Sequence, residues 1–274
     1  MKFCLSSRNS PEYLKQADEI SVQWRDRDII YDLLRDYPKA DVILTIPEGE
    51  ENLQNIVEYN KIANNRLIIR LHRLSLIPRI KEMGIERYFY GYPITSFYDL
   101  RALANLGVCY VRLGAPLFFE LPEVKAVGVP VRAVPDVALV SDIPGQDPLY
   151  GTWIRPEDLD KYAPYIDAIE FESYKDNYEK EAALFRIYAI SKEWNGLLSQ
   201  LIQGFPEQDL NDDVGMNNML LDDALAIRLS CGQKCQSGKS CNICPIAYRI
   251  ASPSKFQKYL DRVAYYQKHP DLKN

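Results

Sequence analysis

Eight short apolar runs lie within residues 1–172. In each run the polar residues occupy alternate positions, that is, positions of one parity, and they lie near the end of the run. In the run 66–72, Arg70 and His72 share one parity, and the opposite parity holds only leucine and isoleucine. Successive side chains of a β-strand point to opposite faces, so each strand has one apolar face and one that turns polar toward one end. The pattern is typical of a parallel barrel, whose strands meet helices outside and a polar cavity inside.

The runs predict strands that mostly start about 20–25 residues apart, with helical patterns between them. The strands cover 2–7, 19–25, 41–47, 66–72, 86–92, 108–114, 130–136 and 166–172, and the helices 28–37, 50–63, 75–83, 96–106 and 178–194. Alternation at this spacing indicates βα units, and the sequence predicts an α/β fold, a (β/α)8 TIM-type barrel. An open doubly wound sheet is the alternative. Segment 115–129 offers at most a short helix.

The barrel is predicted to cover residues 1–194, and 195–274 form a small cysteine-rich appendage. A net charge of −5 and a pI of about 5.3 disfavour bulk binding of nucleic acid. No apolar stretch reaches the ~20 residues of a membrane span. The chain starts with a strand pattern and no signal-peptide core, so we expect a cytoplasmic protein.

Charged residues on the polar parity predict a site at the carboxyl ends of the strands. The candidate catalytic residues are His72, Asp136, Glu170 and Glu172. The candidate ligand-binding residues are Arg8, Gln23, Arg25, Arg70 and Arg112, and Arg132 shares their parity. Arginine suits carboxylate and phosphate, so the expected ligand is a small anionic molecule. The alternative is a plug of salt-bridged side chains that fills the barrel, with His72 as a hydrogen-bonded strut.

The sharpest motif is a stretch of four cysteines with the spacing C-x3-C-x5-C-x2-C. The candidate metal ligands are Cys231, Cys235, Cys241 and Cys244. Four soft sulfur ligands suit zinc or a [4Fe–4S] cluster, and free thiols or disulfides are the remaining alternative. A structural metal would replace a hydrophobic core in the appendage.

Three segments resemble the peptidase U32 family over roughly residues 1–245: Ala17–Ile20, Arg73–Ile77 and Ile154–Leu159. The resemblance implies a TIM-type barrel with a late cysteine cluster. Members are labelled collagenase-like proteases, and several are iron–sulfur proteins that help to hydroxylate RNA bases or quinone precursors. This chain differs from the family in its tightly spaced cysteines and in Gln16 before Ala17-Asp18, where the family has glycine.

Two functional hypotheses follow. In the first, the protein is an enzyme that binds a small anion at the barrel mouth, and the family resemblance implies hydroxylation or a related modification. In the second, the barrel is a non-catalytic binding or assembly scaffold with a structural zinc. The acidic segment 207–223 would then contact a protein partner.

Overall fold

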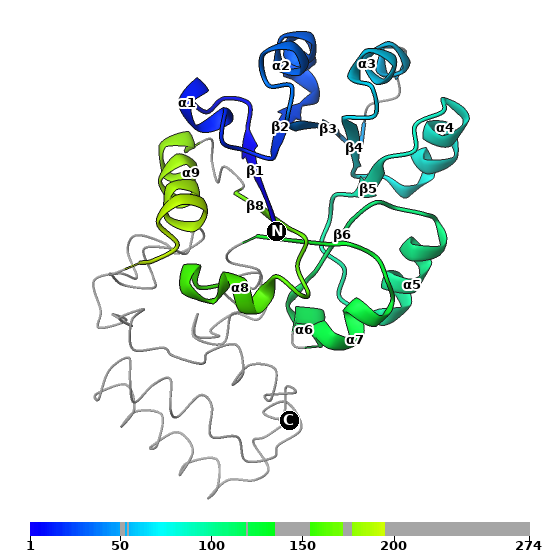
Figure 1. The fold of residues 1–274 in the computed structure, drawn as a ribbon. Helices are drawn as coiled ribbons and strands as arrows, with labels where there is room; N and C mark the ends of the chain where they lie inside the picture. Colours follow the sequence, from blue (N-terminus) through cyan, green and yellow to red (C-terminus); the bar gives the residue numbers. More distant parts are fainter. Residues whose placement is uncertain (50–52, 54, 119, 135–153, 172–176, 195–274) are drawn as a thin grey trace, which may run out of the picture.

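A computed structural model describes residues 1–49, 53, 55–118, 120–134, 154–171 and 177–194 of the chain (Figure 1). The predicted sites at Asp136, Glu172 and the four cysteines lie outside these ranges, as does the acidic segment. In the ranges described, no helix is long and apolar enough to cross a membrane.

Eight parallel strands form one sheet, in the order β5-β4-β3-β2-β1-β8-β7-β6. They are β1 (Lys2–Ser6), β2 (Glu19–Gln23), β3 (Asp41–Ile46), β4 (Leu67–Leu71), β5 (Tyr88–Tyr90), β6 (Val111–Arg112), β7 (Val131–Ala133) and β8 (Ala168–Glu170). A parallel bridge between Phe89 and Tyr110 connects the two edge strands β5 and β6. The eight strands are therefore nearly closed into a TIM-type barrel. Because β1 pairs with both β2 and β8, the open doubly wound alternative is wrong.

The helices lie around the outside of this ring (Figure 1). They are α1 (Pro11–Leu14), α2 (Ile30–Asp36), α3 (Ile56–Ala63), α4 (Ile77–Glu82), α5 (Phe97–Asn105), α6 (Ala115–Phe118), α7 (Leu121–Ala126), α8 (Leu159–Tyr162) and α9 (Tyr178–Phe185). The 3-10 turns are η1 (Trp24–Ile29), η2 (Leu74–Leu76) and η4 (Pro156–Asp158), and a π-helical turn, η6 (Arg186–Ser191), continues α9.

Local sequence explains where these helices begin and end. The Ser96 hydroxyl accepts a hydrogen bond from the Asp99 amide and caps α5. Gly84 and Gly107 have φ values of 72° and 74°, which stop α4 and α5 just before β5 and β6. Pro122 lies in the first turn of α7, so segment 115–129 holds two short helices where the sequence predicted at most one.

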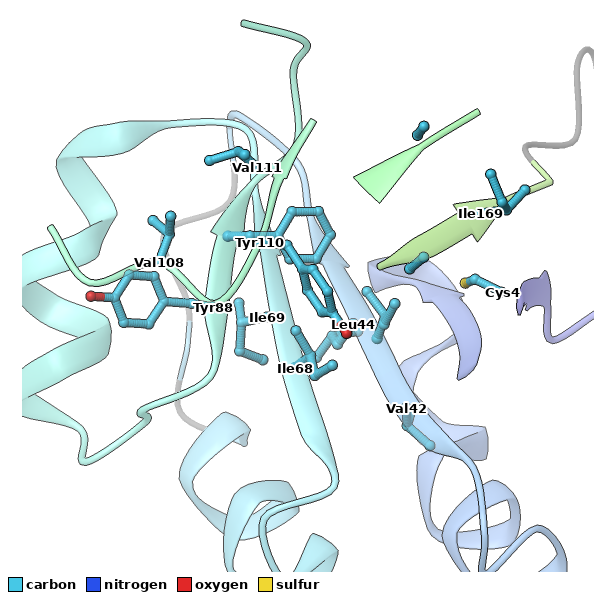
Figure 2. Close-up of a cluster of buried hydrophobic side chains, with 14 of the residues drawn as sticks. Cys4, Val42, Leu44, Ile68, Ile69, Tyr88, Val108, Tyr110, Val111 and Ile169 are labelled. Carbon is cyan, nitrogen blue, oxygen red and sulfur yellow. The ribbon is translucent and has the colours of Figure 1, made fainter. Parts of the chain in front are cut away.

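Buried apolar side chains line both faces of the strands (Figure 2), and those on the outward faces pack against the helices. Leu44, Ile69, Val111 and Ile169 are each 0% exposed because helices cover them. The parity analysis assigned these residues to the helix layer, and this assignment is confirmed. Burial of such side chains contributes about 1.5–3 kcal/mol each.

One strand boundary differs from the prediction in a way that affects the site. β2 was expected to reach Arg25, but its pairing with β3 ends at Gln23, opposite Thr45. The chain then turns into η1, where the Arg27 guanidinium donates to the Trp24 carbonyl. Arg25 therefore lies on a 3-10 turn with 63% of its side chain exposed, and it does not point into the barrel from a strand.

Candidate functional site

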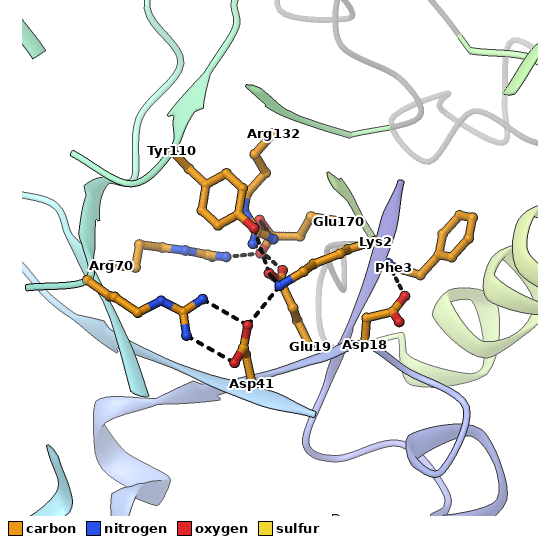
Figure 3. A network of polar contacts seen from close by, with 10 residues as sticks. Lys2, Phe3, Asp18, Glu19, Asp41, Arg70, Tyr110, Arg132 and Glu170 are labelled. Atoms are coloured by element: carbon orange, nitrogen blue, oxygen red, sulfur yellow. Dashed lines mark hydrogen bonds and ion pairs between the residues drawn. The ribbon is translucent and has the colours of Figure 1, made fainter. Parts of the chain in front are cut away.

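Opposite walls of the barrel are joined by buried ion pairs (Figure 3). Arg70 on β4 pairs with Glu170 on β8, and Arg132 on β7 pairs with Glu19 on β2. Arg132 Nη1 also lies 3.6 Å from Glu170 Oε2. The interior charge cluster, made of Glu19, Arg70, Arg132 and Glu170, is at most 4% exposed at any member. The sequence placed Arg70, Arg132 and Glu170 on one inward face, and the structure brings them together.

Aromatic rings separate and support the two arginines. The Phe89 ring lies between them, with its centroid 5.4 Å from the Arg70 guanidinium carbon and 5.2 Å from that of Arg132. Arg132 also lies over the Tyr110 ring at 4.7 Å, and the Tyr110 hydroxyl donates to Glu19 at 3.1 Å. Cation–π contacts of this kind contribute most when the cation is desolvated, as here. In the aromatic run of β5, Phe89 is therefore the residue that faces the interior.

Burial and charge shift the pKa values of groups beside the cluster. Burial raises the pKa of the Cys4 thiol to about 11, so Cys4 is a neutral core residue. Burial and the neighbouring Glu19 raise the pKa of Tyr110 to about 12, which keeps its hydroxyl a proton donor. Burial opposes the charge of Arg132, but Glu19 more than offsets it and raises the pKa of the guanidinium.

A second polar group lies at the amino-terminal end of the barrel. Asp41 accepts hydrogen bonds from Lys2 at 2.8 Å and from Arg87 at 2.8 and 3.0 Å. Burial acts to raise the pKa of Asp41, but these two cations outweigh it and the pKa is lowered. Lys2 also lies 3.6 Å from Glu19, so this group is continuous with the interior charge cluster.

The opposite end of the barrel, where the strands terminate, is the mouth. Here Arg112 Nη1 donates to the Gly91 carbonyl at 2.6 Å, and the His72 imidazole lies directly against the Gly91 backbone. A Cβ at Gly91 would be 2.3 Å from His72 Cδ2, so a side chain at this position would displace the imidazole. The Tyr92 ring lies 4.8 Å from the His72 ring, and its hydroxyl donates to Glu48 at 3.1 Å. Both His72 and Arg112 are partly exposed.

The remaining predicted ligand-binding residues are placed apart from this group. Arg8 donates to Asp26 at 2.8 and 3.2 Å and to the Tyr178 hydroxyl at 2.9 Å, which ties the turn after β1 to η1 and α9. Gln23 ends β2 on the inward face and is exposed. Together with Arg25, these residues surround the β1–β2 side of the mouth.

The sequence analysis missed two buried carboxylates that lie at the first two strands. Glu19 is the first residue of the predicted strand 19–25 and has the same parity as Gln23, so the pattern could have identified it. Glu181 is on α9 and is 0% exposed, and its carboxylate accepts a hydrogen bond from the Ser6 amide at 2.5 Å. Strand parity carries no signal for Glu181, because the residue reaches the barrel from a helix.

The fold and site define a (β/α)8 barrel with a charged, closed interior and a polar mouth. No family model matches the chain, and no curated protein matches it. Similar solved structures include a 3-keto-L-gulonate-6-phosphate decarboxylase from Vibrio cholerae, with 10% identity, coverage of 70% of this chain and 98% of that one, and a TM-score of 0.40. A U32 peptidase has 13% identity, 62% and 92% coverage and a TM-score of 0.38. A 3-dehydroquinate dehydratase from Aquifex aeolicus has 15% identity, 69% and 100% coverage and a TM-score of 0.39. Similarity at this level says nothing about ligand or reaction.

Proposed function

We propose that the barrel binds a small anionic molecule at its mouth, through Arg112 and His72. The observation that carries the proposal is their convergence on Gly91, immediately beyond the interior charge cluster. A guanidinium offers a fork of donors that matches carboxylate and phosphate, and an imidazole can donate to the same anion. The carboxyl ends of the strands are where ligands bind in this fold.

The pairing of charges inside the barrel supports this assignment. Arg112 and Arg132 are register partners on neighbouring strands, so both arginines start from the same wall of the barrel. Like charges in this position repel each other. Arg132 pairs with Glu19, and an anion bound at Arg112 would add a negative charge beside the second arginine of this wall. Arg8, Gln23 and Arg25 would provide further contacts from the β1–β2 side.

We propose enzymatic activity at this mouth with His72 as the group that transfers a proton, since imidazole titrates near neutral pH. Glu170 would then act through the charge cluster, and Asp136 and Glu172 remain sequence-based candidates. The family resemblance adds the expectation of a modification reaction such as hydroxylation. If the turnover rate of the parent protein changes near neutral pH and this change is absent in His72→Gln, the result would support the role of His72.

Binding can be tested by calorimetry on the full-length protein with inorganic phosphate, citrate and hexanoate. We expect saturable binding of at least one anion, weakened about tenfold or more by Arg112→Gln, because a charge-assisted contact is lost. Arg101→Gln, at an exposed position of α5, is the matched control and should leave binding unchanged. Absence of saturable binding to all three anions would refute the proposal.

The scaffold alternative is favoured by one specific observation, the mutual pairing of Arg70 with Glu170 and of Arg132 with Glu19. A plug of this kind needs no ligand, and the acidic segment 207–223 would then present a surface to a protein partner. The double variant Arg70→Met with Glu170→Leu tests the plug, because neither residue belongs to the proposed anion site at Arg112 and His72. If the charges serve packing alone, the variant stays folded and its anion binding is unchanged.

We also propose that Cys231, Cys235, Cys241 and Cys244 bind one zinc ion or a [4Fe–4S] cluster. Four thiolates within fourteen residues match the donor set of either group, and Lys234 and Lys239 would offset their negative charge. Zinc would stabilise the fold of this segment. Metal analysis and absorbance near 400 nm after anaerobic purification discriminate the two. Protein that holds neither metal, with all four thiols free or oxidised, would exclude both.

A further inference from the structure

We infer that the ligand of the mouth is a polyhydroxylated anion, such as a hydroxy acid or a sugar phosphate. This inference rests on the proposed function, because it adds a group of uncharged polar side chains to the anion site at Arg112. It comes from three side chains on the opposite wall: Ser21, Gln23 and Thr45, here called the hydroxyl wall. None of them carries a charge, and all three can both donate and accept hydrogen bonds.

Strand register places the hydroxyl wall on the inner face of the barrel. Gln23 on β2 is the register partner of Thr45 on β3, and Thr45 is in turn the partner of Arg70 on β4. Arg70 points into the barrel, where it meets Glu170. Cross-strand partners share a face of the sheet, so Thr45 and Gln23 also face inward. Ser21 shares their face because it lies two residues before Gln23.

The hydroxyl wall is polar without internal partners. Thr45 is 3% exposed, and its hydroxyl has no hydrogen-bond partner in the structure. Buried hydroxyls are nearly always paired in folded proteins, and leaving one unpaired destabilises the fold. In the described part of the chain, the Ser21 and Gln23 side chains also make no hydrogen bond, although both reach solvent. Such a set is explained by a ligand that supplies the missing groups.

The position of the hydroxyl wall relative to Arg112 defines the shape of that ligand. In the ring of eight strands, three strands lie between β2 and β6 in either direction. Gln23 and Arg112 therefore end strands on opposite walls of the mouth. A molecule bound by Arg112 through a carboxylate or phosphate would extend toward groups that recognise hydroxyls. An alkyl chain in the same place would leave the Thr45 hydroxyl unpaired. A site built to hydrogen-bond a ligand hydroxyl strongly rejects an analogue that lacks it.

Calorimetry on the full-length protein with matched probes tests the inference. Gluconate and hexanoate are both six-carbon carboxylates, and only gluconate carries hydroxyl groups. Ribose 5-phosphate and inorganic phosphate form the corresponding phosphate pair. We expect the hydroxylated member of at least one pair to bind about tenfold or more tightly. The pair that shows the preference identifies the anionic group as carboxylate or phosphate.

Two variants assign the preference to the hydroxyl wall. Thr45→Val and Ser21→Ala should each reduce the preference about three- to tenfold while hexanoate or phosphate binding is unchanged. Ser10→Ala, at an exposed position before α1 that makes no capping hydrogen bond, is the control. Thr45→Val should also raise the Tm of the ligand-free protein by about 1–3 °C, because an unpaired buried hydroxyl is removed.

The outcomes separate this inference from the proposed function. If both members of each pair bind equally and Arg112→Gln weakens their binding equally, the anion site at Arg112 is supported. The role of the hydroxyl wall in recognising ligand hydroxyls is then refuted. If neither member of either pair binds, both ideas fail. A preference for gluconate that survives unchanged in Thr45→Val and Ser21→Ala would also overturn the role of the hydroxyl wall.

Discussion

Arg132 and Glu19 form an ion pair that joins strands β7 and β2, with both side chains 0% exposed. The strands lie three positions apart in the ring, so the pair crosses the interior of the barrel. Two buried charges in contact are rarely more stabilising than a well-packed apolar pair, but either charge alone is very costly. The barrel interior therefore depends on both residues being present together.

Arg132→Met tests this dependence. The substitution leaves Glu19 charged and buried without its main partner, so we expect the free energy of unfolding to fall by about 3–5 kcal/mol. Adding Glu19→Leu should restore much of the loss. Urea unfolding measures both effects, and Arg101→Met on the exposed side of α5 is the control. A single variant as stable as the parent would contradict the pairing.

Asp41 gives the stability a defined pH dependence. Its pKa is lowered in the folded protein, so its contribution is present above the unfolded value of about 3.9 and is lost as the pH falls through the folded pKa. Asp41→Asn should lower stability at neutral pH and flatten the loss of stability below about pH 4. Unfolding curves between neutral and acidic pH measure the slope. Asp160→Asn, exposed on α8, should leave the slope nearly unchanged.

Gly91→Ala tests how the mouth is built. The new Cβ would lie 2.3 Å from His72 Cδ2 and 3.0 Å from Arg70 Cγ, so the imidazole must move. We expect a loss of about 1–3 kcal/mol and weaker anion binding. The His72 imidazole resonance, one of only two in the chain, should shift. Gly49→Ala meets nothing within 4 Å and should change neither property.

Glu181 holds helix α9 against the first strand, and this contact can be measured directly. Glu181→Ala removes the acceptor of the buried Ser6 amide, which should cost about 1–3 kcal/mol and accelerate hydrogen exchange at that amide. Glu181→Gln retains an acceptor oxygen and should lose less. The exposed Glu179→Ala is the control. Equal exchange at Ser6 in all variants would argue against the contact.

The parity of side chains along the strands was enough to predict the barrel and to place Arg70, Arg132 and Glu170 inside it. It could not show which charges pair, because pairing depends on strand register and tilt, which alternate positions do not encode. The pattern was wrong for Arg25 because it assumed that β2 continued, whereas the chain turns after Gln23. Recognising where a strand ends needs its pairing partner as well as its own residues.

The hydroxyl at Thr45 shows a second limit of sequence analysis. Thr45 has the parity of an inner-face residue, but its significance comes from the lack of a hydrogen-bond partner once all its neighbours are in place. A missing hydrogen bond is a property of the packed structure and leaves no mark in the residue pattern. The prediction therefore relied on charged side chains and gave no role to the uncharged residues of the hydroxyl wall.

The interior charge cluster divides evenly between the two halves of the chain. Strands β1–β4 contribute Glu19 and Arg70, and strands β5–β8 contribute Arg132 and Glu170, with both principal pairs crossing between the halves. A fragment containing only one half would hold one glutamate and one arginine in its core, and each of them would lack the ion-pair partner that the other half supplies. Neither fragment should hold a native-like core by itself, and the intact barrel should unfold as one cooperative unit.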